Sequence, residues 1–501
     1  MANKLLNAMK EQNNYKLTEN GGVSLRSTMN GIMDLFALGG AYRSRSDEDC
    51  ISLFETAFNE DPTYALRCLF YLRDCRGGQG ERRFFRVVSR YMARKHTNEM
   101  LRNLKYIPIM GRWDDLYVFI DTPLEKDAFN LMKHQLALDV ECKTPSLLAK
   151  WLKSENTSST NSRMLASITR QHFGMTARQY RKTLSILRER IRVLERLMSQ
   201  GRWDEIEFDK IPSKAGLIYR NAFAKHDLTR ERYEKFAKDE KTKVNAGVLN
   251  PCDVVAKARE EFYHNMEDPT RLMVGKYWDN LHDYFQGATF NGVAVVDTSG
   301  SMTGGIFDSK VQPIDVAISL GMYCAEKCNP NSPWYGNYIT FSRQARLVEI
   351  KGADFVDKVA RIVRTNLCEN TNIESVFDLL LNTAIKNHIP NAEMPKNVII
   401  ISDMEFDAAR GGGYWGYNRT PVIETVMEGI MRKWLSYGYT APHLVFWNVA
   451  ARNDNIPMHD NGSVTFVSGY SATLFEQLLT GKTGWDLIKE KLDSPRYAMI
   501  H

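Results

Sequence analysis

The spacing of apolar residues in the first half of the chain is typical of helices. Between residues 50 and 262, apolar side chains recur three and four positions apart, as at Leu53, Phe54, Ala57 and Phe58. That spacing places them on one face of an α-helix, and short breaks at proline and glycine separate one such segment from the next. Because strand-like alternation is absent here, we predict consecutive helices that stack as a HEAT-like repeat solenoid.

The pattern changes at Gly292, where apolar runs typical of strands begin to alternate with helical segments. The strand-like runs cover residues 293–297, 337–341, 345–350, 397–402, 443–449 and 463–467. The helical segments between them cover residues 313–328, 353–364, 374–387, 420–437 and 471–479. This alternation predicts a Rossmann-like α/β domain, in which a largely parallel sheet has helices on both faces. Ligands of such sheets bind at the carboxyl ends of the strands.

The two patterns divide the chain into three regions. The amino terminus is polar and rich in Gly, Ser and Asn, so we predict a flexible arm over residues 1–30. Residues 31–285 form the predicted helical repeat domain, and residues 290–501 form the α/β domain. A chain of 501 residues is long enough for several domains, each with its own apolar core.

Charge is unevenly distributed along the chain. The net charge is +6, but residues 1–290 carry 47 basic and 38 acidic side chains, whereas residues 291–501 carry 19 and 22. The excess is densest at residues 151–200, with 10 basic and 3 acidic side chains. Much of it falls on a predicted amphipathic helix from the N-cap Thr176 to Gln200. Such a stripe suits phosphate groups, and a solvated helix face explains it equally well.

Two further features bear on the compartment. The sequence has no run of 18 apolar residues and no apolar core of a secretory signal near its start, so we predict no membrane span and no export. The eight cysteines form no CxxC pair, which favours a reducing, cytoplasmic compartment. We expect a monomer.

Polar side chains that suit a divalent cation follow two of the predicted strands. The first strand ends in Asp297 and continues with Ser299 and Ser301, and the fourth is followed by Asp403. Thr371 lies in a loop that opens a predicted helix. Two carboxylates and three hydroxyls are hard oxygen ligands suited to Mg²⁺, with a position left open for an acidic group of a partner. The alternative is that both aspartates only cap the helices that follow them.

This D-x-S-x-S segment, the loop threonine and the later strand-end aspartate resemble the metal-ion-dependent adhesion site (MIDAS) of von Willebrand factor A (vWA) domains. The resemblance implies that Ser299 and Ser301 ligate the ion directly. It implies that Asp297, Thr371 and Asp403 ligate it directly or through water. The cofactor that this site implies is Mg²⁺ or another divalent cation.

Three neighbouring features leave alternatives open. Glu369 and Asn370 stand where many vWA domains have glycines. Glu405 and Asp407 either form a second acidic cluster near the metal or are solvated loop charges. The glycine-rich and aromatic loop at residues 410–417 either stacks bases or packs over the domain.

Three segments of the helical part resemble the Ro ribonucleoprotein family, in which a TROVE module precedes a vWA domain. They are Phe70–Arg83, Gly111–Leu116 and Ile211–Ala215. These segments, together with Ser402–Asp407, look even closer to a branch of uncharacterised plant and viral proteins with the same two-part layout. The resemblance implies a ring of helical repeats closed by the vWA domain, with a basic surface that binds structured or single-stranded RNA.

The same resemblance implies RNA contacts on nine basic side chains in two places. They are Arg73, Arg76, Arg82 and Arg83 around a glycine-rich turn, and Arg178, Arg181, Lys182, Arg188 and Arg192 on the arginine-rich helix. Backbone N–H groups at a helix start, such as that turn provides, suit a phosphate. The alternative for the turn is a structural role, with its arginines paired to Asp74, Glu81 and Asp114.

Two functions remain open, and they use different domains. The first is RNA binding by the helical ring, with the metal site as the contact for a protein partner. The second is a protein-interaction scaffold that acts through the metal site without RNA. We do not expect an enzyme, because no GxSxG or HxxxH motif occurs and no G-K-[ST] follows the glycine-rich turn.

Overall fold

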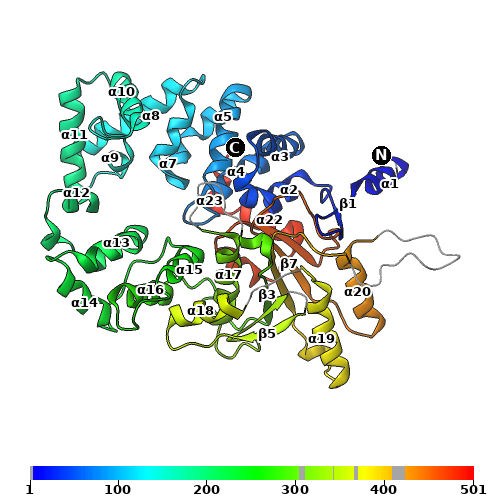
Figure 1. The fold of residues 1–501 in the computed structure, drawn as a ribbon. Coiled ribbons are helices and arrows are strands. Elements are labelled where there is room, and N and C mark those ends of the chain that lie inside the picture. Colours follow the sequence, from blue (N-terminus) through cyan, green and yellow to red (C-terminus); the bar gives the residue numbers. More distant parts are fainter. Residues whose placement is uncertain (1–3, 304–310, 342–343, 366–370, 409–423) are drawn as a thin grey trace.

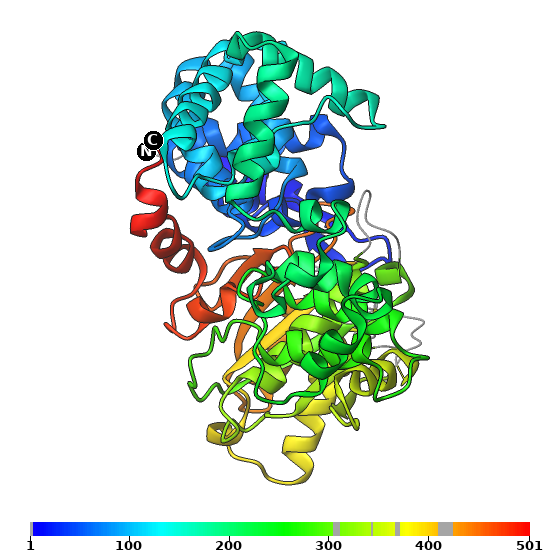
Figure 2. The same ribbon diagram turned by 90° about the vertical axis from the view of Figure 1, so that its left-hand side faces the viewer.

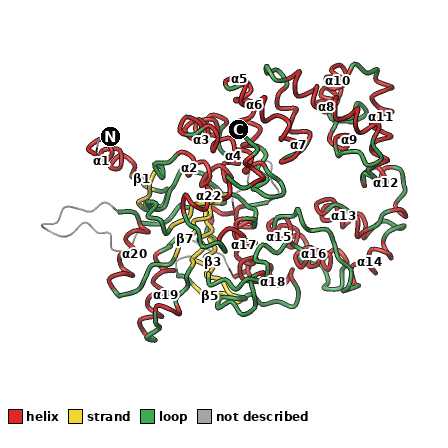
Figure 3. The backbone as a smooth tube through the Cα atoms, turned by 180° about the vertical axis from the view of Figure 1, so that it is seen from behind, coloured by secondary structure: helices red, strands yellow, loops and turns green. Residues whose placement is uncertain are grey.

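The computed structural model describes residues 4–303, 311–341, 344–365, 371–408 and 424–501 (Figure 1). Glu369, Asn370 and the loop at residues 410–417 lie outside these ranges. A mostly helical region is followed by a mixed α/β domain, as the apolar pattern predicts. Figure 3 shows the strands gathered in one part of the molecule. The remainder is an arc of helices joined by loops.

The helical region follows the amino-terminal segment and runs from α2 to α16. Its first helices are α2 (Gly31–Leu38), α3 (Asp47–Glu60), α4 (Pro62–Arg73), α5 (Arg83–Lys95), α6 (Thr97–Asn103), α7 (Ile107–Met110) and α8 (Glu125–Glu141). The later ones are α9 (Leu148–Trp151), α10 (Thr160–Phe173), α11 (Ala177–Arg190), α12 (Leu194–Ser199), α13 (Ser213–Lys225), α14 (Arg230–Lys238), α15 (Pro251–Glu260) and α16 (Pro269–Asp279). Helices close in sequence pack on one another, as α3 does on α4 and α5, which is the arrangement of a solenoid.

The arginine-rich segment forms two helices, so the prediction of one helix to Gln200 is wrong. α11 ends at Arg190 and α12 begins at Leu194. Between them Arg192 takes the left-handed conformation, with φ of 48°. The backbone N–H of Val193 then donates to the carbonyl of Arg188 at 3.2 Å, which closes the helix end. Apolar spacing continues across this turn, so periodicity alone does not reveal it.

The α/β domain contains a six-stranded sheet in the order β5-β4-β3-β6-β7-β8. Its strands are β3 (Gly292–Asp297), β4 (Asn337–Phe341), β5 (Arg346–Glu349), β6 (Asn397–Ser402), β7 (His443–Asn448) and β8 (Val464–Ser468). Its helices are α17 (Pro313–Lys327), α18 (Phe355–Thr365), α19 (Glu374–Lys386), α20 (Val426–Ser436), α21 (Leu474–Leu478), α22 (Gly484–Leu492) and α23 (Pro495–Ala498). Each pair of neighbouring strands is parallel except β4 and β5.

The sheet is covered on both faces. Successive residues of a strand point to opposite faces, and every residue of β3 is buried. This burial on two sides is typical of a parallel sheet with helices on both faces. The chain crosses from one half of the sheet to the other between β3 and β6, which makes their carboxyl ends the expected ligand edge.

Both ends of the helical arc pack against the α/β domain. At the start of the arc, α2 lies on β7 and β8, and α4 lies on α22 and α23. At its end, α15 lies on α17 and α18. Figures 1 and 2 show the helices leaving the α/β domain on one side and returning to it on another. The helical region and the α/β domain together therefore form a ring.

Charged side chains join the two domains at each junction. Asp74, just after α4, accepts hydrogen bonds from the Tyr497 hydroxyl at 2.8 Å and from Arg496 at 2.7 Å. At the other junction the Arg271 guanidinium holds both carboxylate oxygens of Asp354, at 2.7 and 2.8 Å. Bidentate pairs of this kind fix geometry as well as adding attraction. The ring closure is therefore built from specific polar contacts and not from apolar packing alone.

The amino-terminal segment packs on the α/β domain, in contrast to the flexible arm that its composition predicts. It consists of α1 (Lys4–Asn14), β1 (Tyr15–Leu17) and β2 (Val23–Leu25), and the two strands form an antiparallel hairpin. Leu25 is fully buried and bridges Ile456, and Gly21 bridges Asp407. Two of the polar residues that suggest an arm, Thr18 and Asn20, donate side-chain hydrogen bonds to main-chain carbonyls of the α/β domain.

Two negative predictions concern membrane spans and cysteines. No helix in the described ranges has the length and apolar character needed to cross a bilayer. The cysteines in those same ranges are free thiols. Cys324 and Cys328 lie in or next to α17 and are buried, as expected for core thiols. Burial raises the pKa of the Cys324 thiol well above its usual value, which makes that sulfur unreactive.

Candidate metal centre and basic surface

The carboxyl ends of β3 and β6 bring the predicted ligands to one edge of the sheet. The two strands are parallel neighbours, with Val296 opposite Ile401. Asp297 therefore lies beside Ser402, whose hydroxyl donates a hydrogen bond of 2.6 Å to the Asp297 carboxylate. Asp403 follows directly. Ser402 was not among the predicted ligands, although the strand register could have revealed its position.

The loop after β3 wraps around the Asp297 carboxylate. The backbone N–H of Ser299 donates to Asp297 Oδ1 at 2.9 Å, and the Ser299 and Ser301 hydroxyls lie 3.0 Å apart. Thr371 is buried. Its carbonyl accepts a hydrogen bond of 3.0 Å from the N–H of Asp407, which places it beside the segment that continues β6. The structure thus gathers the predicted residues around one edge, as the spacing of the three segments predicts.

The two aspartates repel one another in a buried setting. Burial and the neighbouring Asp403 carboxylate raise the pKa of Asp297 from its usual 3.8 to about 7. Burial also raises the pKa of Asp403, while hydrogen bonds from Ser301 and Arg452 oppose that rise. Two buried carboxylates next to each other need a compensating cation or a proton. The donor set of carboxylate and hydroxyl oxygens fits Mg²⁺ or another hard divalent cation.

Arg452 is a member of this site that the sequence does not reveal. Its guanidinium lies 3.2 Å from Asp403 Oδ2 and 3.0 Å from Glu19 Oε2. Part of the positive charge that Asp403 needs therefore comes from this arginine. Met404, directly after Asp403, has a left-handed φ of 63° although it is not glycine. Such strain is common where a strand end has to present ligands.

The turn between β1 and β2 lies against the same edge. The Asn20 amide donates to the carbonyl of Glu405 at 2.6 Å and approaches the Thr371 hydroxyl at 3.4 Å. The N–H of Glu19 donates to the Glu405 carboxylate at 2.8 Å. A side chain at Gly22 would meet the carbonyl oxygen of Phe406 at 2.5 Å, so only glycine fits there. The amino-terminal turn is therefore part of the sheet edge that carries the candidate ligands Asp297 and Asp403, which we call the metal edge.

Glu405 fits neither of its two sequence-based alternatives, a second acidic cluster near the metal or a solvated loop charge. Its side chain is fully buried and accepts hydrogen bonds from the Glu19 N–H and, at 2.9 Å, from the Asn453 amide. It is neither a solvated loop charge nor free to ligate. Its carboxylate holds the amino-terminal turn in place. This contact joins residues almost 390 positions apart, which explains why sequence patterns give no sign of it.

Two of the nine basic residues are structural. Arg73 is buried, and its guanidinium pairs with the buried Asp115 at 2.6 Å. Arg188 donates to the carbonyls of Ala149 and Leu152 at 2.8 and 2.7 Å and to the Ser154 hydroxyl at 2.8 Å. Neither group can reach a phosphate without leaving these partners, so both residues are removed from the predicted RNA surface.

Four others have a partner within the chain but remain at least partly exposed. Arg83 pairs with Asp47 at 2.6 Å, Arg181 with Glu155 at 3.1 Å and Arg192 with Glu207 at 2.9 Å, and Arg76 donates to the Ile109 carbonyl at 3.0 Å. The structural alternative for the glycine-rich turn therefore holds in part. Arg73 and Arg83 do pair with carboxylates, but those are Asp115 and Asp47. The side chains of Asp74, Glu81 and Asp114 pair instead with arginines outside this set, namely Arg496, Arg43 and, for Asp114, Arg86 and Arg112.

The remaining three cations are exposed and unpaired. Arg82, Arg178 and Lys182 form no ion pair and no side-chain hydrogen bond with any residue that the structure describes. Arg178 and Lys182 are one helical turn apart on α11, so they lie on the same face of that helix. These three residues are the part of the predicted basic surface that the structure leaves available to a ligand.

Comparison with known proteins identifies relatives without an assigned activity. A family model described as a domain of unknown function (DUF2828) matches residues 18–172 and 134–282, and another (DUF7788) matches residues 291–496. The uncharacterised protein L728 of Acanthamoeba polyphaga mimivirus is 31% identical over 515 residues, which cover 94% of this chain and 85% of that protein. This viral relative agrees with the resemblance to a viral branch.

The comparison with solved structures finds the crystal structure of the Ro (RSR) protein of Deinococcus radiodurans. The superposition covers 94% of this chain and 100% of that chain, with 11% sequence identity and a TM-score of 0.42. The ring closure is shown by the helix contacts at its two junctions, and the grouping of the candidate ligands by the register of β3 and β6.

Proposed function

We propose, from the premise that this chain belongs to the DUF2828 family and is a relative of the mimivirus protein L728, that it is a binding protein and not an enzyme. Its helical ring binds RNA, and its metal edge contacts a protein partner. The relatives found carry no activity in their names, so the proposal is supported by the site geometry and by the sequence resemblance to Ro proteins.

RNA binding is supported by the unpaired cations of the helical region. Arg178 and Lys182 present two positive charges on one face of α11, and Arg82 presents a third after the glycine-rich turn. Contacts of this kind go to phosphates and carry little sequence information. The ring therefore selects RNA by charge and shape more than by base identity. Arg181 lies beside the first two and joins them once RNA displaces Glu155.

Partner binding is supported by the buried pair of carboxylates. Asp297, Ser299, Ser301, Thr371 and Asp403 are the residues that would hold Mg²⁺. The ion supplies an electrophilic position that an Asp or Glu of a partner can complete. The chain contributes the orientation: Ser402 and the Ser299 N–H fix the Asp297 carboxylate, and Asn20 approaches Thr371. A partner carboxylate binds here without any bond being broken.

A second candidate is the scaffold that uses the metal edge without RNA. It is favoured by the bonding of the basic residues, because Arg73, Arg76, Arg83, Arg181, Arg188 and Arg192 all have partners within the chain. In the scaffold candidate these paired arginines stabilise the ring and do not contact RNA. The two candidates differ in one property, which is affinity for RNA.

The proposal is tested by fluorescence anisotropy of a labelled hairpin RNA with a single-stranded 3′ tail. We expect binding that weakens steeply when the salt concentration rises from about 50 to about 200 mM, because each phosphate contact releases counterions. The Asp297→Ala variant should bind this RNA as the wild type does. Absence of binding below about 10 μM at low salt contradicts the RNA function, since even nonspecific basic surfaces register there.

A further inference from the structure

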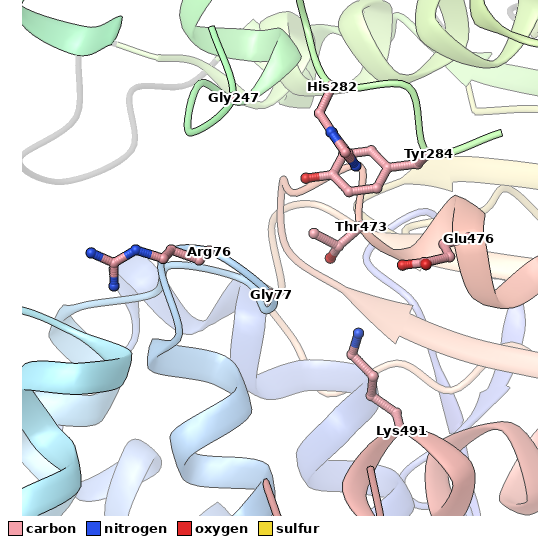
Figure 4. A pocket seen from close by; sticks show the side chains of 8 residues that line it. All are labelled: Arg76, Gly77, Gly247, His282, Tyr284, Thr473, Glu476 and Lys491. Carbon is pink, nitrogen blue, oxygen red and sulfur yellow. The ribbon is translucent and has the colours of Figure 1, made fainter. Parts of the chain in front are cut away.

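A small cavity lies where three distant parts of the chain meet. It has a volume of about 230 Å³ and is lined by the turn after α4, the loop before α15, the linker before β3, and α21 and α22. The side chains that matter are those of Arg76, His282, Tyr284, Thr473, Glu476 and Lys491 (Figure 4). No predicted function uses this cavity, and of its residues only Arg76 was among the predicted RNA contacts.

Lys491 is the central feature of the cavity. Figure 4 shows its ammonium rising from α22 toward Thr473 and Tyr284. It makes no hydrogen bond or ion pair with any described residue, and the nearest aromatic face, that of Tyr71, lies 5.8 Å away. Burial lowers the pKa of this ammonium. The carboxylates of Glu476 and Asp74 attract this ammonium from a distance and offset part of that effect. Because neither of them bonds to it, its N–H groups are available to an oxygen of a ligand.

Two hydroxyls can donate to the same anion. The Tyr284 hydroxyl has no partner among the described residues, and Figure 4 shows it facing into the space above Thr473. The Thr473 hydroxyl accepts a hydrogen bond from Ser471 at 3.1 Å, so its own hydrogen is available. One ammonium and two hydroxyl donors that line the same cavity match the oxygens of a phosphate group.

The wall near Glu476 differs from the rest of the cavity. Its carboxylate is exposed and is contacted only weakly, by the Gln286 amide at 3.4 Å. A carboxylate repels a bare phosphate but accepts hydrogen bonds from sugar hydroxyls. The rings of His282 and Tyr284 meet edge to face, with their centroids 4.5 Å apart, and form another part of the cavity wall. The cavity thus joins a cationic end to a hydroxyl-accepting side.

We propose that this cavity binds a phosphate monoester carried on a ribose. The phosphate lies against Lys491, Tyr284 and Thr473, and a ribose hydroxyl donates to Glu476. The cavity is smaller than the sites of drug-sized ligands, which are about 300–1,000 Å³, so it holds the phosphate and sugar and leaves the base at the rim, near Arg76. The ligand is either a free mononucleotide or the phosphorylated end of an RNA.

The position of the cavity gives the ligand a structural consequence. Its walls come from both arms of the helical arc and from the α/β domain. The ligand bonds to the linker before β3 and to the α/β domain, and its base lies near Arg76 on the first arm. It therefore stabilises the junction between that arm and the α/β domain by mass action, to an extent that grows with its concentration relative to its dissociation constant. This role goes beyond the RNA surface of α11, which contributes no residue to the cavity.

The test is calorimetric titration of the full chain with three probes: inorganic phosphate, adenosine 5′-monophosphate, and a short RNA with a 5′-phosphate. We expect at least one probe to bind and to raise the melting temperature. Lys491→Met should weaken that binding at least tenfold, since it removes the only ammonium among the residues that line the cavity. Lys489→Met is the matched control, because Lys489 is exposed on the same helix and does not line the cavity.

The probes separate the two sources of the ligand. Binding of the mononucleotide identifies a free nucleotide, and binding of the RNA alone, lost with a 5′-hydroxyl, identifies an RNA end. Tyr284→Phe keeps the aromatic wall and provides a second variant if Lys491→Met does not fold. The proposal is overturned if no probe binds at millimolar concentration, or if Lys491→Met and Tyr284→Phe both bind like the wild type. Charge changes at Arg178 and Lys182 should leave these titrations unchanged.

Discussion

Single residues at the metal edge determine its charge. Asp297 and Asp403 are both buried, and Arg452 reaches only the second of them. Any cation that enters must therefore share Asp403 with a guanidinium that is already present. Glu19 holds the same guanidinium from the other side. Competition between Arg452 and the metal is the direct consequence.

Arg452→Gln should raise the affinity of the edge for Mg²⁺. Removing a partly exposed competing charge should make the free energy of Mg²⁺ binding more favourable by about 1 kcal/mol. That change lowers the dissociation constant roughly fivefold. Isothermal titration calorimetry measures it. Arg432→Gln serves as the control, because that exposed arginine pairs with Glu424 on the surface. Unchanged or weaker Mg²⁺ binding in Arg452→Gln argues against the competition.

Asp297→Asn should stabilise the metal-free protein at pH 8 and abolish its response to Mg²⁺. The raised pKa of about 7 means that the folded state holds this proton more tightly than the unfolded state, where the pKa is 3.8. The stability contributed by that proton is present at low pH and is lost as the pH rises from about 4 to about 7. The asparagine mimics the protonated form at every pH.

Thermal melting at pH 5 and pH 8, with and without Mg²⁺, gives the readout. The wild type should gain melting temperature from Mg²⁺ at pH 8, and Asp297→Asn should not. If Mg²⁺ leaves the melting temperature of the wild type unchanged at both pH values, there is no metal site at this edge.

At the level of elements, the edge is assembled from segments that are far apart along the chain. The strand ends supply Asp297 and Asp403, the loop before α19 supplies Thr371, and the β1–β2 turn supplies Asn20. The turn is held by the Thr18 hydroxyl, which donates to the Phe406 carbonyl at 2.7 Å. The metal edge should therefore respond to changes in the amino-terminal hairpin.

Gly22→Ala tests this link. The added carbon would lie 2.5 Å from the Phe406 carbonyl oxygen, so the turn has to move and Asn20 loses its place beside Thr371. We expect a loss of about 1–3 kcal/mol in the free energy of unfolding together with weaker Mg²⁺ binding. Gly275→Ala, inside α16, should keep both properties, because the added carbon would lie at an ordinary van der Waals distance of 3.9 Å from the Phe355 Cβ. Normal Mg²⁺ binding in Gly22→Ala separates the turn from the metal edge.

The strands of the α/β domain could be predicted from the sequence more closely than the other elements. The strand-like runs match β3 to β8 within one or two residues, because buried parallel strands have a strong local signature. The positions of the candidate ligands Asp297 and Asp403 could be predicted for the same reason, since each lies at a strand end. The turn at Arg192 and the packing of the amino-terminal hairpin were not, because they depend on a single backbone conformation and on contacts far along the chain.

The basic residues show the limit of charge counting. Arg73 and Arg178 look alike in sequence, yet Arg73 is buried against Asp115, whereas Arg178 is exposed and has no partner in the part of the chain that the structure describes. Only the fold decides which arginines hold the protein together and which are available to a ligand. The candidate RNA surface is accordingly smaller than the nine residues that the sequence indicates.

At the level of the whole molecule, the ring depends on its two junctions. The pair between Arg271 and Asp354 joins α16 to the segment that leads into α18, and both side chains are largely buried, with 8% and 25% exposed. Breaking one partner of a buried pair leaves the other charge without compensation. The junction is therefore a point where a single substitution affects the entire ring.

Arg271→Leu should lower the free energy of unfolding by about 3 kcal/mol, the usual cost of breaking a buried pair. Denaturant unfolding followed by circular dichroism measures it. Lys238→Met is the control, because its pair with Glu234 is exposed and is worth at most about 0.5 kcal/mol. Equal stabilities for the two variants show that this junction does not hold the ring closed.

The most direct test of the central claim, RNA binding by the helical ring, is anisotropy of the tailed hairpin RNA with a charge-reversal pair. Arg178→Glu with Lys182→Glu changes only exposed, unpaired side chains of α11. Lys386→Glu with Lys396→Glu changes the same net charge in the α/β domain, also at exposed positions. The account predicts at least tenfold weaker binding and a shallower salt dependence for the α11 variant alone. Equal affinity for both variants and the wild type contradicts it.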